Sequence, residues 1–414
     1  MSNLLMLTAS FPYEGGEQFI EPEINFWGES SFNKKYILPE TGSVNKRYYP
    51  DNICLLNDLI NRNKHFIFIF IFISFFSSIF WKEVKYLVLK RELNFAIFFS
   101  TLFFVARVLF YKLYLKKIVK RLKGEILIYS YWNDIGYYAS CLLKKEYKRI
   151  KIISRAHGFD LYEERRKFTY MPLKRQFKDN AEKIYLLSES ALAYYRDRYS
   201  YSEERLDISR LGVFLPNKIK YFNSDKKTFT VLSLSSCIPI KRVDKIIDAI
   251  YQFSVKNNIR VNWVHIGDGV LFDQLKNKTK KLSDLNNNFN GTFLGQLSNK
   301  DVHEWLSITN VDVIINASES EGVPVSLMEA MSYGIPAIAP DIGGISTLIV
   351  ENNGYLMSSA ADVYEIIMGL ETIFSLQDVN SYRNSARNMI DRQFNAEKNY
   401  KAFVSQAEKM IENE

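Results

Sequence analysis

Short apolar segments rich in β-branched residues alternate along the chain with longer segments of helical periodicity. This alternation predicts parallel β-sheets covered by helices. A polar, turn-rich stretch at 216–227 interrupts it and is typical of a linker. The strands expected before that stretch are 4–8, 36–38, 53–56, 126–129, 150–154, 184–187 and 208–211, and those expected after it are 231–235, 263–266, 292–294, 313–315 and 337–339.

The same pattern predicts two doubly wound α/β domains and a helical tail. We expect a first domain at 1–215, a second at 216–380, and a charged helical segment at 381–414 that crosses back to cover the first domain. A length of 414 residues agrees with two domains of ordinary size. Open α/β sheets bind ligands at the carboxyl ends of their strands. The expected fold class is therefore α/β, with two Rossmann-like domains facing a central cleft that holds the site.

Two apolar runs in the first domain stand beside a basic cluster. The runs are 66–81, which opens with alternating Phe and Ile, and 95–110, and the cluster of Lys and Arg lies at 112–123. The first run is shorter than the ~20 apolar residues of a membrane-spanning helix. We expect these helices to bind an anionic membrane surface peripherally, because exposed Phe and clustered Lys suit the interface and its head groups. Core helices of the α/β domain and a true transmembrane segment are the alternatives.

Composition narrows the class of protein and its compartment. The chain is 47% hydrophobic and 24% charged, which is typical of a globular protein. Its three cysteines are far apart and lack zinc-ligand spacing, so a reducing cytoplasm is expected. The first residues lack the features of a secretory signal and predict a buried strand. The net charge of +8 is concentrated in the basic cluster, so we expect a membrane surface, and not nucleic acid, as the anionic partner on the inner face of the cell membrane.

The most informative segment is 318–336, which predicts a strand end, a glycine turn and a helix at 323–333. Pro324 suits the first helical turn and Gly334 the C-terminal cap. The N–H groups at the start of such a helix favour an anion or a sugar phosphate. Glu321 and Glu329 are eight residues apart, so one carboxylate lies at the mouth of the helix and the other on its side. The alternative is that both glutamates merely solvate a surface helix.

Glu321 to Glu329 resembles the E-x7-E motif of retaining glycosyltransferases of the GT-B fold, family 4 type, and 343–344 resembles the glycine pair that follows it. The resemblance covers most of 229–350 and, more loosely, the whole chain. It implies that Glu321 binds the hydroxyls of the donor sugar, that the amides of Gly322 and Val323 hold sugar and phosphate, and that Glu329 binds the ribose.

A second stretch, 233–244, resembles the part of that family that holds the donor diphosphate. The resemblance implies that Lys241 binds it, and a fixed cation there would stabilise the leaving diphosphate without a metal. Many members carry an arginine where this chain has Ser236, so either Arg242 supplies the second charge or Ser236 binds the phosphate by a hydrogen bond. Both Lys241 and Arg242 have the alternative of being solvated helix residues.

Further matches are shorter. Gly267-Asp268-Gly269 resembles the family's G-x-G turn, for which a purely structural role is expected. Gln296 and Leu297 resemble the loop that meets the nucleobase, with a plain turn at a strand end as the alternative.

In the first domain, His157 follows a strand and resembles the family's histidine near the transferred sugar, with a satisfied core histidine as the alternative. Asp160 either touches the acceptor or caps the next turn. Gly15 and Gly16 resemble the first glycine loop, which allows close approach of phosphate and acceptor, with an ordinary strand-to-helix turn as the alternative. The catalytic residues implied are His157, Glu321 and Lys241. We expect no cofactor and no metal, because the chain has no Asp-x-Asp signature and His65, His265 and His303 have no metal-like grouping.

The resemblance implies a retaining glycosyltransferase that moves a sugar from a UDP- or GDP-linked donor to a lipid-linked, lipopolysaccharide or capsule oligosaccharide. Two other functions stay open. One is a GT-B-type nucleotide-sugar epimerase, which the E-x7-E segment disfavours. The other is a catalytically silent, membrane-docked scaffold of a polysaccharide assembly complex, suggested by Ser236 where a cation is common.

Overall fold

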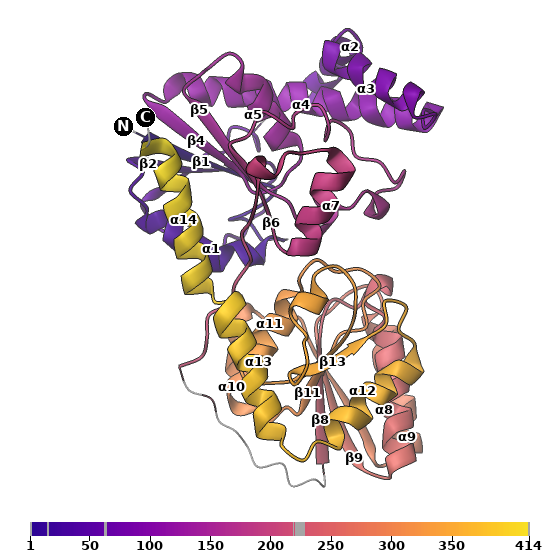
Figure 1. Ribbon diagram of the computed structural model, residues 1–414. Helices are drawn as coiled ribbons and strands as arrows, with labels where there is room; N and C mark the ends of the chain where they lie inside the picture. Colours follow the sequence, from indigo (N-terminus) through magenta and orange to yellow (C-terminus); the bar gives the residue numbers. More distant parts are fainter. Residues whose placement is uncertain (1, 15, 62–63, 218, 220–227, 413–414) are drawn as a thin grey trace. The chain divides into compact units, whose positions relative to one another are not determined.

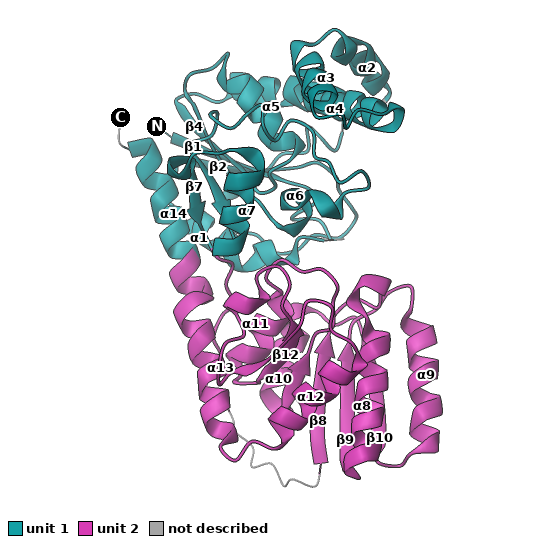
Figure 2. Cartoon of the chain, turned by 45° about the vertical axis from the view of Figure 1, so that its right-hand side comes forward, with its two compact units in different colours: residues 1–209, 400–414 teal, residues 210–399 magenta. Residues whose placement is uncertain are grey.

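The computed structural model describes residues 2–14, 16–61, 64–217, 219 and 228–412, and the chain forms two compact units (Figures 1 and 2). Unit 1 comprises Met1–Ser209 and Tyr400–Glu414, and unit 2 comprises Arg210–Asn399. Most of the predicted linker, namely 218 and 220–227, lies outside the described residues, as does Gly15.

Unit 1 is built on a seven-stranded parallel sheet of order β3-β2-β1-β4-β5-β6-β7. The order reverses between β1 and β4, which is where open α/β sheets place their ligand-binding loops. These strands are apolar on both faces because helices cover both. The strands are β1 (Ser2–Thr8), β2 (Lys34–Pro39), β3 (Ile53–Leu55), β4 (Glu125–Ser130), β5 (Ile150–Arg155), β6 (Lys183–Leu186) and β7 (Leu206–Ile208).

Helices from both ends of the chain cover this sheet: α1 (Glu21–Glu29), α4 (Phe95–Arg121), α5 (Ile135–Lys144), α6 (Gly158–Leu161), α7 (Glu189–Tyr199) and the end of α14 (Ala396–Glu412). The α14 helix packs over a charged pair inside the core. Arg155 and Glu23 form an ion pair with no solvent exposure, and the Arg155 guanidinium lies 4.4 Å from the ring centre of Phe403 on α14. Phe403, Val404 and Ala407 of α14 are buried in the same core cluster, and this packing holds α14 against unit 1.

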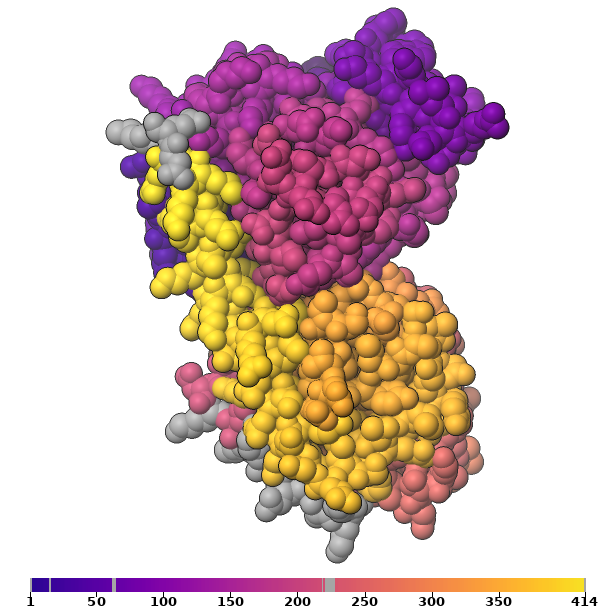
Figure 3. Space-filling model, viewed as in Figure 1, coloured from indigo at the N-terminus to yellow at the C-terminus, as the bar shows by residue number. Residues whose placement is uncertain are grey.

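The two apolar runs form a helical extension of unit 1 made by α2 (Ile67–Phe75), α3 (Ser78–Leu89) and the first half of α4 (Figures 1 and 3). Ser77 separates α2 from α3 by capping the second helix through Phe80 N–H. By length and composition, α4 is the one helix of the described chain that could cross a membrane, and α2 with α3, bent by 60°, would make a second if counted as one broken span. However, Val105, Val108 and Leu115 of α4 are fully buried in the core of unit 1. The second run therefore serves partly as a core helix.

Unit 2 carries a six-stranded parallel sheet of order β10-β9-β8-β11-β12-β13. Its strands are β8 (Thr228–Leu234), β9 (Arg260–Ile266), β10 (Phe289–Gly295), β11 (Val313–Ile315), β12 (Ala337–Pro340) and β13 (Gly354–Met357). Its helices are α8 (Val243–Asn257), α9 (Phe272–Leu285), α10 (Asn299–Ile308), α11 (Val325–Ser332), α12 (Val363–Phe374) and α13 (Val379–Gln393). The two parallel α/β sheets are those that the alternation predicted, while β13 and α12 were not predicted.

The predicted helical tail 381–414 is two helices, α13 and α14, rather than one. The break comes from a tertiary contact: Val213 N–H donates to Phe394 O at 2.9 Å, and Ala396 N–H donates to Val213 O at 3.1 Å. A Cβ on Gly212 would lie 2.5 Å from the Cα of Ala396, so only glycine allows this approach. The packing on unit 1 begins at Tyr400, within α14, and α13 belongs to unit 2.

Candidate functional site

Glu321 and Lys241, eighty positions apart in sequence, meet in unit 2. Lys241 Nζ donates to Glu321 Oε1 at 2.5 Å, and the same oxygen accepts from Ser318 Oγ at 2.7 Å and Asn316 Nδ2 at 3.1 Å. Glu321 lies between β11 and α11, and Lys241 lies just before α8. The carboxylate is thus held in place by one cation and two neutral donors, so its orientation is set by the protein.

The glycine pair at 343–344 fixes the loop that carries Glu321. Gly343 has φ +58°, and a Cβ there would lie 2.2 Å from the carbonyl oxygen of Glu321. Gly344 N–H donates to Gly322 O at 2.7 Å. A side chain at 343 would push the Glu321 loop away, which explains why glycine is needed there.

Helix α11 runs over Val325–Ser332, slightly shorter than the predicted 323–333, because Pro324 is its N-cap and not its first helical residue. Its first N–H groups have no acceptor within the helix. Gly322 is half-buried and Val323 is buried directly before this end. The amides predicted to hold sugar and phosphate are therefore at a helix start, next to Glu321.

Glu329 is buried and not a surface residue. Its Oε1 accepts from Asn299 Nδ2 at 2.5 Å and lies 3.9 Å from His303 Nε2, both on α10. Burial raises the pKa of Glu329 to about 7, and the hydrogen bond from Asn299 opposes the rise. The carboxyl is consequently poised between its neutral and ionised forms near neutral pH, which excludes the alternative that it only solvates a helix.

The loop before α8 is shaped by Gly267 and Gly269, which have φ +141° and +155°. A Cβ on Gly267 would lie 1.9 Å from Ser235 O, and one on Gly269 would lie 2.7 Å from Cys237 O. The two glycines therefore allow the turn 267–269 to contact the loop 235–237, which is the structural role expected of them. Ser236 lies on the loop 235–237 and is exposed.

Arg242 is engaged by carboxylates at the start of α8. Its Nη1 donates to Glu319 Oε1 at 2.6 Å, and its Nη2 donates to Asp244 Oδ2 at 3.1 Å. These bonds raise the pKa of Arg242. A donor diphosphate would have to compete with Glu319 and Asp244 for Arg242. For Lys241 it would have to compete with Glu321.

Gln296 and Leu297 follow β10, in the turn begun by Gly295 at φ +72°. Gln296 is exposed, and its Nε2 donates to Leu297 O at 3.2 Å. Gly267 N–H donates to Gly295 O at 2.8 Å, so this turn lies beside the G-x-G loop.

In unit 1, His157 lies among aromatic rings after β5. Its ring stacks on Tyr131 with centroids 4.9 Å apart and lies 4.7 Å from the Trp132 ring. The side chain is 7% exposed, and neither ring nitrogen has a hydrogen-bond partner in the described part of the chain. Burial, with a smaller effect of Arg155, holds the pKa of His157 well below its usual range. The imidazole is therefore neutral at pH 7.

Asp160 caps the turn after β5. Its Oδ1 accepts from His157 N–H at 2.6 Å and its Oδ2 from Asn133 N–H at 2.5 Å, while the residue is 1% exposed. Burial raises the pKa of Asp160 to about 6, and Lys174 opposes the rise. This geometry corresponds to the capping alternative.

The loop that contains Gly16 already holds an anion of the protein. The Glu17 carboxylate accepts from the N–H groups of Ala9 at 2.9 Å, Ser10 at 2.6 Å and Phe11 at 2.6 Å. It also accepts from Trp132 Nε1 at 2.5 Å. The N–H groups of Ala9, Ser10 and Phe11 are thus satisfied within the protein.

Sequence reasoning missed several residues of these sites: Glu17, Asn299, Asn316 and Ser318. Two signals were present. Asn316 and Ser318 directly follow β11, at the sheet edge where ligands bind, and Asn299 and His303 are spaced i, i+4 on one helix face.

The chain is similar to known proteins in sequence and in fold. Residues 216–393 match the family described as "Glycosyl transferases group 1". Over 122 residues, 29% of this chain, the sequence is 32% identical to the O-antigen biosynthesis glycosyltransferase WbnH of Escherichia coli, and the match spans 31% of the length of that relative.

Several solved structures resemble the whole chain. The lipopolysaccharide outer core galactosyltransferase WaaB, in its apo form, superposes with a TM-score of 0.68 at 18% identity over 98% of both chains. Anabaena Alr3699/HepE in complex with UDP and glucose superposes with a TM-score of 0.64 at 16% identity over 97% of this chain and 98% of that chain. These likenesses confirm the predicted fold class of two Rossmann-like domains, the GT-B fold.

Proposed function

We propose that the protein is a retaining glycosyltransferase of the family 4 type that transfers a sugar from a nucleotide-sugar donor to a glycan acceptor. The observation that carries the proposal is the contact between Lys241 and Glu321 directly before helix α11. It joins a cation suited to a diphosphate with a carboxylate suited to sugar hydroxyls. The match of 216–393 to group 1 glycosyl transferases supports the same conclusion.

Unit 2 holds the donor in this proposal. A bound diphosphate draws Lys241 away from Glu321, and Glu321 then accepts hydrogen bonds from the sugar hydroxyls. The amides of Gly322 and Val323 face the sugar and phosphate, and Glu329, when ionised, accepts from the ribose. The structure of HepE with UDP and glucose supports a UDP-linked donor, while a GDP-linked one is the other candidate.

The chemical step is a front-face displacement. The bond between the anomeric carbon and the phosphate oxygen breaks, the acceptor oxygen bonds to the same face of that carbon, and the acceptor proton passes to the leaving phosphate. Lys241 stabilises the charge that develops on the diphosphate, since preorganised donors act most strongly where charge develops. No metal is required in this scheme.

The acceptor proposed is a lipid-linked, lipopolysaccharide or capsule oligosaccharide at the inner face of the cell membrane. The O-antigen and lipopolysaccharide relatives support a cell-surface glycan. The exposed Phe68, Phe72 and Phe95 of the helical extension support peripheral binding to a bilayer. Within the basic cluster, Lys112 and Lys116 pair with Glu146, and Arg121 pairs with Asp58. Membrane attraction is therefore assigned to the exposed Lys117, Lys120 and Lys123.

The test is release of nucleoside diphosphate from a panel of UDP- and GDP-sugars, with and without a membrane lipid extract as acceptor. A transferase releases nucleoside diphosphate when the acceptor is present, and the sugar appears in the lipid fraction. An epimerase would change the sugar with no acceptor and release none. A scaffold would do neither, and either of these outcomes contradicts the proposal.

A further inference from the structure

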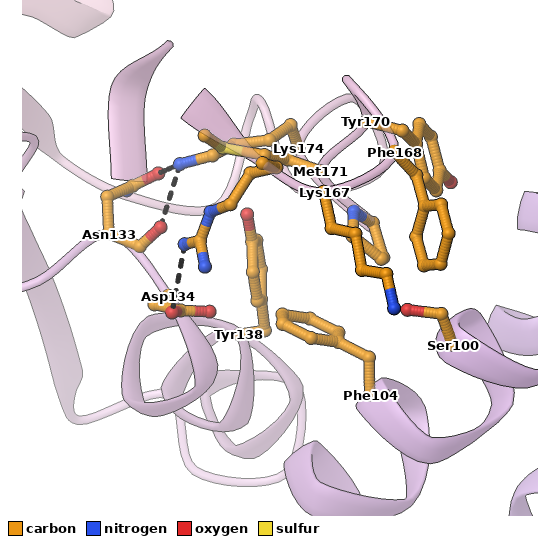
Figure 4. A pocket seen from close by; sticks show the side chains of 12 residues that line it. Ser100, Phe104, Asn133, Asp134, Tyr138, Lys167, Phe168, Tyr170, Met171 and Lys174 are labelled. Carbon is orange, nitrogen blue, oxygen red and sulfur yellow. Dashed lines mark hydrogen bonds and ion pairs between the residues drawn. The ribbon is translucent and has the colours of Figure 1, made fainter. Parts of the chain in front are cut away.

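Unit 1 contains a cavity of about 280 Å³ between α4, the start of α5 and the segment 166–174 (Figure 4). This is just below the ~300–1,000 Å³ of ordinary small-molecule sites. One part of its wall is charged, from Arg166, Lys167 and Lys174. Another part is formed by the rings of Phe104 and Tyr138, which Figure 4 shows side by side. The cavity has room for a head group and not for an oligosaccharide.

The charges of the wall are unbalanced, because the only acid among the lining residues is Asp134. Lys174 is 2% exposed, and its Nζ donates to Asn133 O at 2.7 Å and Oδ1 at 2.6 Å, while the nearby carboxylate of Asp160, behind the wall, balances its charge. Arg166 Nη2 lies 3.5 Å from Asp134 Oδ2, a long contact for an ion pair. Arg166 and Lys167 are therefore the cations of the wall that favour an anionic occupant, with the single acid Asp134 among the lining residues.

Arg166 is positioned to receive that anion. Its guanidinium lies 3.7 Å from the ring centre of Phe159, which fixes its plane, and its buried Nε has no hydrogen-bond partner in the described residues. A planar guanidinium with an unused donor suits a phosphate oxygen. Lys167 extends along the cavity towards Ser100 in Figure 4 and adds a second cation.

The cavity also borders an apolar surface. Ser100 and Phe104, one turn apart on α4, line it. Phe99 and Phe103, on the adjoining strip of the same helix, are 39% and 50% exposed. An occupant that satisfies both surfaces has a phosphate group joined to a hydrocarbon chain.

The geometry points to a binding site for a phosphate-bearing lipid, with the phosphate at Arg166 and Lys167 and the chain along Phe99 and Phe103. Its use as the carrier of the acceptor glycan rests on the proposed function, but binding is measurable without turnover.

The probes are octyl phosphate, inorganic phosphate and 1-octanol, titrated calorimetrically into the full-length protein. We expect octyl phosphate to bind at least about tenfold more tightly than either other probe, equivalent to about 1.4 kcal/mol. Equal affinities for octyl phosphate and inorganic phosphate would show a free-phosphate site and overturn the proposal. If 1-octanol bound as tightly as octyl phosphate, the phosphate would contribute nothing to binding, and the proposal would be overturned as well.

Variants locate the site. Arg166→Gln with Lys167→Gln should weaken octyl phosphate binding at least tenfold, while the matched pair Lys148→Gln with Lys178→Gln, exposed elsewhere on unit 1, should leave it unchanged. Phe99→Ser with Phe103→Ser should remove the advantage of octyl phosphate over inorganic phosphate. Asp134→Asn, which removes the one acid of the wall, should tighten binding. Unchanged affinity in the first pair or looser binding in Asp134→Asn overturns the assignment.

UDP and GDP binding, followed by thermal shift in the same preparations, separates this inference from the proposed function. Octyl phosphate binding without nucleotide binding would retain the lipid site and contradict the transferase. Nucleotide binding without octyl phosphate binding would overturn the lipid site and leave the transferase proposal standing.

Discussion

Glu321 and Glu329 belong to one segment but lie in opposite environments. Their side chains are similarly buried, but Glu321 accepts from a lysine, a serine and an asparagine, whereas Glu329 has a single amide donor on its Oε1 and a pKa of about 7. Burial with few hydrogen-bond donors is what raises the pKa of Glu329. In the proposed function this gives a fixed acceptor for the sugar and a carboxyl that responds to pH.

Replacing Lys241 tests the first of these environments. We expect Lys241→Ala to lower kcat by roughly 10²–10³ with a smaller change in donor affinity, because the charge it stabilises develops in the transition state. The measurement is steady-state release of nucleoside diphosphate, in EDTA and in Mg²⁺, which should give equal rates. Lys300→Ala, an exposed lysine on α10, is the control. Equal kcat in the two variants would contradict the role of Lys241.

Glu321→Gln keeps the shape of the side chain and removes its charge. We expect loss of measurable transfer with an unchanged melting temperature to within a few degrees, because the amide accepts sugar hydroxyls poorly and cannot pair with Lys241. Glu304→Gln, exposed on the neighbouring α10, should retain full activity. Near-normal turnover in Glu321→Gln would remove this residue from the donor site.

Glu329 makes stability depend on pH. Its folded-state pKa, about 7, is above the ordinary value, so between about pH 4.5 and 7 the folded state holds a proton that the unfolded state has lost. Its contribution to the free energy of unfolding therefore falls as pH rises through this window. Relative to the wild type, Glu329→Gln should gain about 1–3 kcal/mol between pH 4.5 and 7.5. Urea unfolding at several pH values measures this, and a constant difference would contradict the assignment.

Elements were predictable where a strand has an apolar centre rich in β-branched residues and polar or turn residues on either side, as β4 and β11 do. The strand β13 was missed because Gly354-Tyr355-Leu356-Met357 has no β-branched residue. The run 66–81 was read as one apolar feature, but Ser77 divides it. The pairs Lys112–Glu146 and Arg121–Asp58 join positions far apart in sequence, and no local pattern predicts them. The site residues Glu321 and Lys241 were found through the motif, and their supporting donors through the structure.

Helix α14 gives a prediction at the scale of the element. Phe403 is 2% exposed and contacts Trp27, Tyr129 and Tyr185 as well as Arg155. We expect Phe403→Ala to lower the free energy of unfolding of unit 1 by about 3–5 kcal/mol. Hydrogen exchange resolved by segment should show faster exchange in β4 and β5 and little change in β8. Tyr364→Ala, 65% exposed on α12, should change neither.

In the whole molecule, the proposed donor residues of the E-x7-E and lysine motifs lie in unit 2, and the exposed apolar helices lie in unit 1. Membrane binding and nucleotide binding are therefore separable measurements on the full-length protein. The whole chain carries a net charge of +8, but the exposed part of the basic cluster on and directly after α4 is only Lys117, Lys120, Arg121 and Lys123.

We expect vesicles with anionic lipid to co-sediment the protein, with binding weakened by salt, since exposed charges are screened over ~8–10 Å at about 0.1–0.15 M. Lys117, Lys120 and Lys123 changed to Gln should release most of the protein. As a control, the exposed Lys276, Lys280 and Lys281 of α9 changed to Gln should leave vesicle binding unchanged. Phe68→Ser with Phe72→Ser should also release it, unlike Val270→Ser with Leu285→Ser. Failure of the wild type to bind at low salt would leave the apolar helices without a membrane role.

Because Phe403 covers the buried Arg155–Glu23 pair, the order of synthesis has a consequence for folding on the ribosome. The strands of unit 1 leave the exit tunnel first, but the helix that closes over them follows roughly 190 residues later, about 10–40 s at ~5–20 residues per second. At the end of that interval the whole of unit 2 has been synthesised, while unit 1 still lacks the part of α14 that begins at Tyr400. Unit 1 is therefore synthesised first but completed last. Until α14 packs, the core surface that Phe403 covers is exposed, and a nascent-chain chaperone would encounter it.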